Sequence, residues 1–147
     1  MSDQREILVL NGPNLNRLGS RETSIYGTTT LADIEAMCRE EAAKHGLGCR
    51  FVQSNHEGAL VEAIHQAIDD DLAGVVINAS AYTHTSVALR DALSMVAAPI
   101  AEVHISNIYK RKEFRHHSFI SPVATGVIAG FGPATYCLAI AAIASSR

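Results

Sequence analysis

The sequence has only three cysteines, and Cys38, Cys49 and Cys137 are far apart, odd in number and outside any CxxC motif. Disulfide-stapled domains use an even set of cysteines, and thiolate metal sites use closely spaced pairs. The sequence therefore favours reduced thiols in a cytoplasmic protein, with neither a disulfide framework nor a cysteine-bound metal.

A marked excess of charge of either sign is also absent. The 147 residues include 12 Lys and Arg against 15 Asp and Glu, for a net charge of -3, and 48% of them are hydrophobic. This balance disfavours a disordered chain and a broad nucleic-acid surface, so we expect no nucleic-acid partner. The length suits one domain with its own core, and we expect residues 1–147 to form a single domain.

No Asp, Glu, Lys or Arg occurs between Arg115 and Arg147. A membrane span is one alternative here, because it needs only about 20 apolar residues. Four residues that break secondary structure interrupt the stretch: Gly126, Gly130, Gly132 and Pro133. We interpret it as a buried strand, a Gly-Pro turn and a helix, and expect no membrane association. The apolar run Ile7–Leu10 is too short for a signal peptide, which again favours the cytoplasm.

Motifs of several reaction classes are missing. Neither GxxxxGK[ST] nor GxGxxG occurs, which disfavours nucleotide binding. Lys44, Lys110 and Lys112 have polar neighbours, whereas Schiff-base chemistry needs a desolvated lysine. No HExxH or comparable spacing indicates a metal, and Asn11 and Asn78 stand where a phosphoacceptor domain would need acids. What remains is acid-base chemistry by Tyr and His, without a metal or cofactor.

Apolar strand patterns alternate with helical ones along the chain. The predicted strands are Ile7–Leu10, Cys49–Gln53, Gly74–Ile77, Ile100–Ile105 and Val123–Ile128. The predicted helices run from the N-cap Thr30 to Gly46, over Leu60–Ile68 and Thr85–Ala97, and from Pro133 onward. This order predicts an α/β protein, a flavodoxin-like three-layer sandwich with a five-stranded parallel sheet. The last helix is apolar nearly all round over Tyr136–Ala144, which favours a homo-oligomer.

Unusual polar residues follow three of these strands. Asn11 and Asn14 follow the first, Asn78 to His84 the third, and His104 to Ser106 the fourth. Because parallel α/β folds bind ligands at the carboxyl ends of their strands, we expect one site there. Ordinary turn chemistry is the alternative for Asn11 and Asn14, since asparagine tolerates left-handed backbone conformations.

The fourth strand carries a carboxylate and an imidazole on one face. Glu102 and His104 are two residues apart, about 7 Å at their Cα atoms in a strand. The carboxylate can then hold the imidazole tautomer and raise its proton affinity, as suits a general acid. A buried structural ion pair is the alternative.

Two polar loops complete the set of candidates. A loop of about twenty residues precedes Thr30, long enough to be a lid, and places Tyr26 near Arg21. A nearby cation favours the phenolate, so Tyr26 is a candidate base, unless its ring simply packs on the surface. In the second loop, Arg111 and Arg115 share a face if the segment is helical and can grip an anionic or polyhydroxylated ligand. A solvated basic turn is the alternative, and nucleic-acid binding a weaker one.

The spaced polar motifs match one known family. They are Asn11–Gly19, Arg21–Glu22, Tyr26–Gly27, Asn78 with Thr83–Ser86, Glu102–Asn107 and Phe114–Ser118. In these motifs the chain resembles the type II 3-dehydroquinate dehydratases from its first strand to Gly132. The resemblance implies a flavodoxin-like catalytic domain that forms a homododecamer of four trimers. It implies reversible trans-elimination of water from 3-dehydroquinate to 3-dehydroshikimate through an enolate, in the shikimate or quinate pathway.

The resemblance also implies roles for individual residues. Tyr26, its phenolate favoured by Arg21, would abstract the proton next to the ketone, and Asn14 would hold a water at the enolate oxygen. His104, steadied by Glu102, would protonate the departing hydroxyl. The implied substrate-binding residues are Asn78, His84, Asp91 from a neighbouring subunit, Ile105, Ser106 and Arg115.

One residue departs from the family pattern. Ser80 stands where the family usually has a glycine, which makes the backbone angle at this position decisive for the loop. The alternative function is a ligand-binding or scaffolding oligomer that keeps the fold without turnover.

Overall fold

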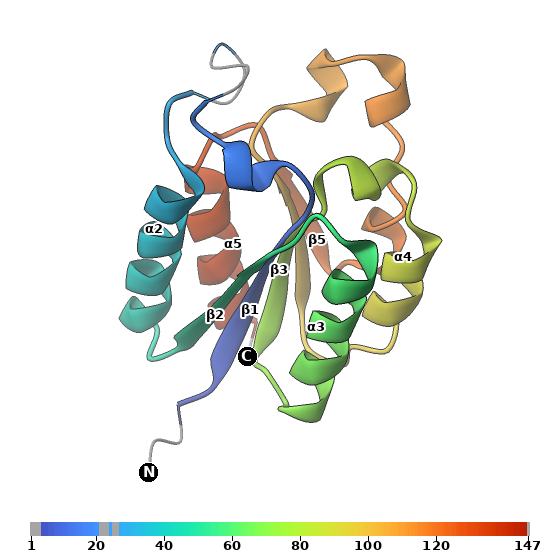
Figure 1. Ribbon diagram of the computed structural model, residues 1–147. Helices are drawn as coiled ribbons and strands as arrows, with labels where there is room; N and C mark the ends of the chain where they lie inside the picture. The colour runs from blue at the N-terminus through green and yellow to red at the C-terminus, as the bar shows by residue number, and fades with distance from the viewer. Residues whose placement is uncertain (1–3, 21–23, 25–26, 147) are drawn as a thin grey trace.

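The computed structural model describes residues 4–20, 24 and 27–146. Its centre is a five-stranded, all-parallel sheet in the order β2-β1-β3-β4-β5 (Figure 1). In chain order the strands are β1 (Glu6–Asn11), β2 (Gly48–Gln53), β3 (Gly74–Asn78), β4 (Ile100–His104) and β5 (Gly126–Ala129). This arrangement confirms the predicted flavodoxin-like architecture.

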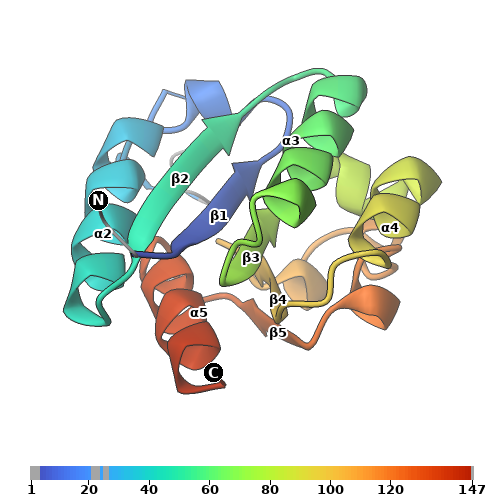
Figure 2. The same ribbon diagram turned by 90° about the horizontal axis from the view of Figure 1, so that it is seen from below.

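In the part of the chain that the structure describes, four α-helices cover the two faces of the sheet. Figure 2, which looks along the strands, separates α2 (Leu31–Lys44) and α5 (Ala134–Ser145) on one face from α3 (Glu57–Asp69) and α4 (Val87–Leu93) on the other. Strand β1 shows why both faces are filled. Ile7 and Val9 enter the core under α2 and α5, whereas Leu8 and Leu10 enter the core under α3 and α4. The uninterrupted apolar run of β1 thus reflects burial on both sides.

The predicted start of the first long helix is confirmed in detail. The Thr30 hydroxyl accepts a hydrogen bond from the Asp33 N–H, and the Asp33 carboxylate accepts one from the Thr30 N–H. This reciprocal pair is a capping box, which satisfies two backbone donors at the beginning of α2.

Two predicted elements are shorter in the structure than the sequence indicated. The helix predicted over Thr85–Ala97 is only Val87–Leu93, because Ser86 serves as its N-cap and the chain tightens after Leu93. The N–H groups of Met95 and Val96 each bond to a carbonyl three residues back, which ends the α-helix. The strand predicted from Val123 begins only at Gly126, since Pro122 initiates a 3-10 turn over Ser121–Val123.

The apolar C-terminal stretch folds in the predicted order of strand, turn and helix. The prediction of a buried strand was wrong, because β5 lies at the edge of the sheet, with Gly126 and Val127 exposed. Gly130 and Gly132 both have positive φ in the turn between β5 and α5. Among the described residues, no helix has the length and apolar character needed to span a bilayer.

Candidate active site

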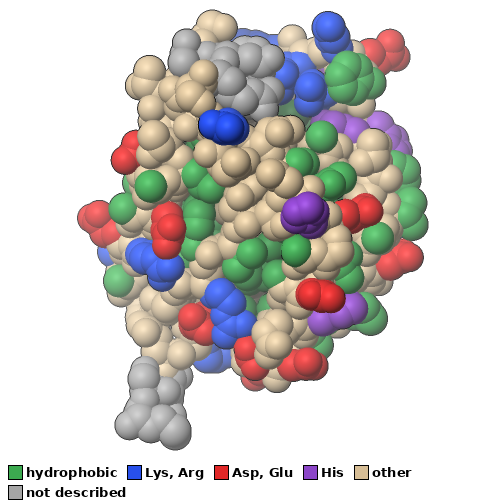
Figure 3. Space-filling view, in the orientation of Figure 1, with side chains coloured by type: hydrophobic (Ala, Val, Ile, Leu, Met, Phe, Trp, Pro, Cys, Tyr) green, Lys and Arg blue, Asp and Glu red, His purple; other side chains and the backbone are tan. Residues whose placement is uncertain are grey.

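A pocket opens at the carboxyl ends of β1, β3 and β4, along the upper edge of the sheet in Figure 1. Its lining consists of Asn14, Leu15, Leu18, Asn78, Ser80, His84, His104, Ile105, Ser106, Ile108, Arg111 and Arg115. Basic side chains gather at the same end of the molecule in the space-filling view (Figure 3). The loops that follow three separate strands therefore converge on one polar, positively charged hollow.

This pocket contains most of the site residues predicted from the sequence. Those that line it are Asn14, Asn78, His84, His104, Ile105, Ser106 and Arg115. Glu102 contacts His104 from within β4. Asp91 is exposed on α4 and is absent from the lining formed by the described residues of its own chain. Arg21 and Tyr26 lie outside the residues that the structure describes.

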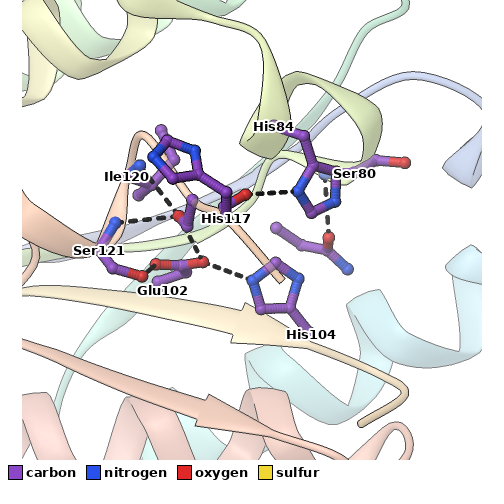
Figure 4. A network of polar contacts seen from close by, with 9 residues as sticks. Ser80, His84, Glu102, His104, His117, Ile120 and Ser121 are labelled. Atoms are coloured by element: carbon purple, nitrogen blue, oxygen red, sulfur yellow. Dashed lines mark hydrogen bonds and ion pairs between the residues drawn. The ribbon is translucent and has the colours of Figure 1, made fainter. Parts of the chain in front are cut away.

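A short, buried polar contact in the wall of the pocket joins His104 to Glu102 (Figure 4). The Nε2 atom of His104 is 2.5 Å from Oε2 of Glu102, and both side chains are almost fully buried. Because the carboxylate can only accept, Nε2 carries a hydrogen and donates it. Nδ1 has no hydrogen-bond partner among the described residues, so it is the atom through which His104 can exchange a proton with a ligand.

Two serines to which the sequence analysis gave no role hold the buried carboxylate; Ser118 ends one of the quoted motifs, and Ser121 belongs to none of them. Ser118 donates to Oε2 of Glu102 at 2.9 Å, and Ser121 donates to Oε1 at 2.5 Å. Burial alone raises the pKa of Glu102, but the hydrogen bonds from His104, Ser121 and Ser118 outweigh burial and lower this pKa below its ordinary value. Glu102 therefore stays ionised inside the protein. No helical or strand periodicity marks the two serines, because Ser118 lies in a loop and Ser121 begins a short 3-10 turn.

His84 is held as a neutral ring. Its Nδ1 lies 2.7 Å from the carbonyl oxygen of His117, an acceptor, so Nδ1 must carry the hydrogen (Figure 4). Burial lowers the pKa of His84, and the charges of His104 and Arg115 add to this effect. In the neutral ring Nε2 is an acceptor, which suits a ligand hydroxyl that donates a hydrogen bond.

The peptide after β4 directs an N–H group away from the neighbouring turn. The carbonyl of Ile105 accepts a hydrogen bond from the Gly132 N–H at 3.0 Å. In a trans peptide the C=O and N–H point in opposite directions, so the Ser106 N–H faces away from Gly132. Since Ser106 also lines the pocket, this donor is suited to an anionic ligand.

Asn14 combines the two explanations that the sequence left open. Its φ of 69° is left-handed, as turn chemistry requires, yet the residue also lines the pocket. Its N–H donates to Oδ1 of Asn55 at 2.9 Å, and Nε2 of Gln53 donates to the same oxygen. Asn11 has a different position, because its side chain is fully buried among core residues.

The continuous helix that would place Arg111 and Arg115 on one face does not form. Ile108–Lys110 and Glu113–Arg115 form two separate 3-10 turns, and Arg111 between them has extended backbone angles. Both arginines nevertheless line the pocket. The Arg115 guanidinium also packs over the Phe114 ring, with its central carbon 4.8 Å from the ring centre. The fold of the loop, and not helical spacing, brings both arginines to the pocket.

No cluster of three or more His, Cys, Asp or Glu side chains in the described part of the chain is arranged to hold a metal ion.

Comparison with known proteins identifies the family. Residues 5–144 match the model of the family described as dehydroquinase class II. The 3-dehydroquinate dehydratase of Azorhizobium caulinodans is 60% identical over 147 residues, which is 100% of this chain and 97% of the relative. That of Variovorax paradoxus is 55% identical over 143 residues, or 95% of this chain and 98% of the relative.

Solved structures agree with the sequence comparisons. The crystal structure of type II dehydroquinase from Propionibacterium acnes is 49% identical in sequence and superposes with a TM-score of 0.92 over 97% of each chain. The enzyme of the same type from Butyrivibrio crossotus is 44% identical, with a TM-score of 0.93 over 97% of this chain and 99% of that chain. With a matching fold, matching motifs and a family model over nearly its whole length, the chain belongs to the class II dehydroquinase family.

Proposed function

We propose that this chain is a hydro-lyase that converts 3-dehydroquinate to 3-dehydroshikimate and water, and the reverse, in one catalytic domain. Family membership and the 60% identical dehydratase support the reaction. The observation that carries the proposal is the buried His104–Glu102 pair in the wall of a polar pocket. An imidazole held by an ionised carboxylate is suited to give a proton to a leaving hydroxyl.

The proposed reaction needs one base and one acid on opposite sides of the substrate. Tyr26, with Arg21 favouring its phenolate, takes the proton from the carbon next to the ketone, and the electron pair forms an enolate. Asn14 holds a water that hydrogen-bonds the enolate oxygen. As the enolate collapses, the carbon–oxygen bond of the leaving hydroxyl breaks, and Nδ1 of His104 supplies the proton that completes the water molecule.

The rest of the pocket supplies the groups that a hydroxylated carboxylic acid needs. In the proposal the amide of Asn78 and the N–H groups of Ile105 and Ser106 receive the carboxylate. His84, through its acceptor nitrogen, and Arg115 bind the hydroxyls. This division matches each ligand group with a complementary donor or acceptor.

We further propose that the active form is a homododecamer of four trimers, in which Asp91 of a neighbouring subunit reaches the pocket. Several large apolar side chains are exposed on the single chain, among them Phe131 at 68%, Val127 at 47% and Leu138 at 48%. Burying these side chains between subunits would remove apolar surface from contact with water, which favours association. Because Cys38, Cys49 and Cys137 are free thiols, we assign the enzyme to the reducing cytoplasm.

Adding 3-dehydroquinate to the purified protein tests the reaction directly. The expected result is a steady rise in ultraviolet absorbance, because the product contains a conjugated enone. Borohydride added with the substrate should leave activity intact, since no lysine imine forms. Binding without any rise in absorbance would instead support the ligand-binding or scaffolding alternative.

A further inference from the structure

Tyr136 connects the end of the sheet to the core of α5. Its side chain is fully buried, and its hydroxyl lies between the last residues of two neighbouring strands, Asn11 of β1 and Asn78 of β3. These two asparagines are paired in the sheet register. Tyr136 Oη donates to Oδ1 of Asn11 at 2.7 Å and accepts from Nδ2 of Asn78 at 2.9 Å.

These contacts form a series of hydrogen bonds that runs from Val52 to Ser80. The groups at its two ends determine the direction of every hydrogen bond in the series. At one end, the carbonyl of Val52 only accepts, so the Asn11 group facing it at 3.1 Å is the NH2 of its amide. Asn11 then presents its oxygen to Tyr136, whose single hydroxyl hydrogen is used there. The hydroxyl can therefore only accept from Asn78, which must offer its NH2.

At the other end, the Ser80 N–H donates to Oδ1 of Asn78 at 3.2 Å. A backbone N–H can only donate, so this contact independently requires the oxygen of Asn78 at that position. Burial also raises the pKa of Tyr136, so its hydroxyl keeps its hydrogen. The Asn78 amide thus has one favoured orientation, and its NH2 has a second hydrogen beyond the one given to Tyr136.

We propose that Tyr136 is a positioning residue that holds the Asn78 amide with its NH2 available to the pocket, so that the site selects a carboxylate over an uncharged ester. This inference rests on the proposed function, in which Asn78 receives the substrate carboxylate. An amide turned by 180° would present its oxygen, which repels a carboxylate. Tyr136 itself lies in the core and does not touch the ligand.

Substitution Tyr136→Phe removes the hydroxyl and keeps the ring. Among the described residues, the Ser80 N–H is then the one hydrogen-bond partner left to hold the Asn78 amide, and Asn11 loses its donor. We expect the KM for 3-dehydroquinate to rise about tenfold, the scale of one hydrogen bond to a charged group. We expect kcat to change little and the pH profile of kcat to keep its shape, because the proposed acid and base are untouched.

The decisive measurement is the ratio of dissociation constants for 3-dehydroshikimate and its methyl ester. Wild-type protein should prefer the acid, and Tyr136→Phe should reduce that preference about tenfold. Ile140→Val in the same helix is the matched control, because it removes buried volume from α5 without touching the polar chain. Equal loss of preference in both variants, or an unchanged ratio in Tyr136→Phe, would overturn the inference.

Two further arms keep the result interpretable. Asn11→Ala frees the Tyr136 hydrogen to donate to an Asn78 oxygen, so it should also lower the preference, and it replaces Tyr136→Phe if that variant does not fold. Asn78→Ala tests the proposed function separately. If Asn78→Ala keeps the full acid preference, the carboxylate lies elsewhere. If only Asn78→Ala loses it, the failure belongs to the role of Tyr136.

Discussion

Nε2 of His104 donates to Oε2 of Glu102 over 2.5 Å, two residues earlier on the same buried strand. The pair needs no long-range folding to meet, because alternate residues of a strand point to the same side of the sheet. What tertiary structure adds is the ionised state of the carboxylate, since the hydroxyls of Ser118 and Ser121 complete its hydrogen bonding.

Replacing His104 with alanine should remove the proposed general acid. We expect kcat to fall by about 10²- to 10⁴-fold, with a much smaller change in KM, because the lost interaction belongs to the transition state. Steady-state kinetics with 3-dehydroquinate measures both constants. His65→Ala, on the exposed side of α3, is the control and should retain wild-type rates. Turnover within threefold of wild type in the His104 variant would contradict the assigned role.

Glu102→Gln should change how stability depends on pH. The folded-state pKa of Glu102 lies below its ordinary value of 4.5, so the folded protein binds fewer protons than the unfolded chain in this range. The carboxylate's contribution to the free energy of unfolding is therefore fully present above pH 4.5. It disappears as the pH falls through the lower folded-state value.

Urea unfolding at a series of pH values measures this contribution. We expect wild type to exceed Glu102→Gln in free energy of unfolding by about 1–3 kcal/mol at pH 7, and the difference to shrink as the pH falls below 4.5. Glu62→Gln, which alters an exposed carboxylate, is the control. A gap between wild type and the Glu102 variant that widens toward acid pH would show that the sign is wrong.

Ser80→Gly should stabilise the loop after β3. The backbone at Ser80 has φ of 54°, a left-handed conformation that costs a residue with a Cβ about 1–2 kcal/mol. Glycine removes this cost but gains about 0.4–1 kcal/mol of freedom in the unfolded chain. The free energy of unfolding should therefore rise by about 0.5–1 kcal/mol.

The matched control for this position is Ser80→Ala, which keeps the Cβ and so brings no relief of the backbone. Both variants retain the N–H that donates to Asn78, so neither should abolish activity. Denaturant titrations of the three proteins decide the point. The explanation fails if alanine stabilises as much as glycine does.

The fold and the His104–Glu102 pair could both be predicted from local patterns. Continuous apolar runs indicate strands buried on both faces, and a period of two puts Glu102 beside His104. The position of Asn78 and His84 near the site could also be predicted, because the carboxyl ends of parallel strands share one edge of the sheet. These inferences need only the periodicity of a regular element.

The remaining features depend on irregular structure or on distant partners. Ser118 contacts Glu102 from a loop, and Ser121 contacts it from the start of a single 3-10 turn, so neither belongs to an element with a long repeat. The sequence pattern indicates Tyr136 only as one residue of an apolar helix, since its partners Asn11 and Asn78 are 125 and 58 positions away in the chain. Helical spacing does not describe the arrangement of Arg111 and Arg115, because two short 3-10 turns form where one continuous helix would be needed.

The loop after Arg115 serves several parts of the pocket at once. The carbonyl of His117 sets the hydrogen on His84, while the hydroxyls of Ser118 and Ser121 hold Glu102. After an insertion or deletion of even one residue between positions 117 and 121, the hydrogen bonds to His84 and to Glu102 could no longer form at the same time. In a library of length variants, insertions and deletions in this segment should rarely yield active enzyme. Substitutions that preserve the length of the segment should yield active enzyme more often.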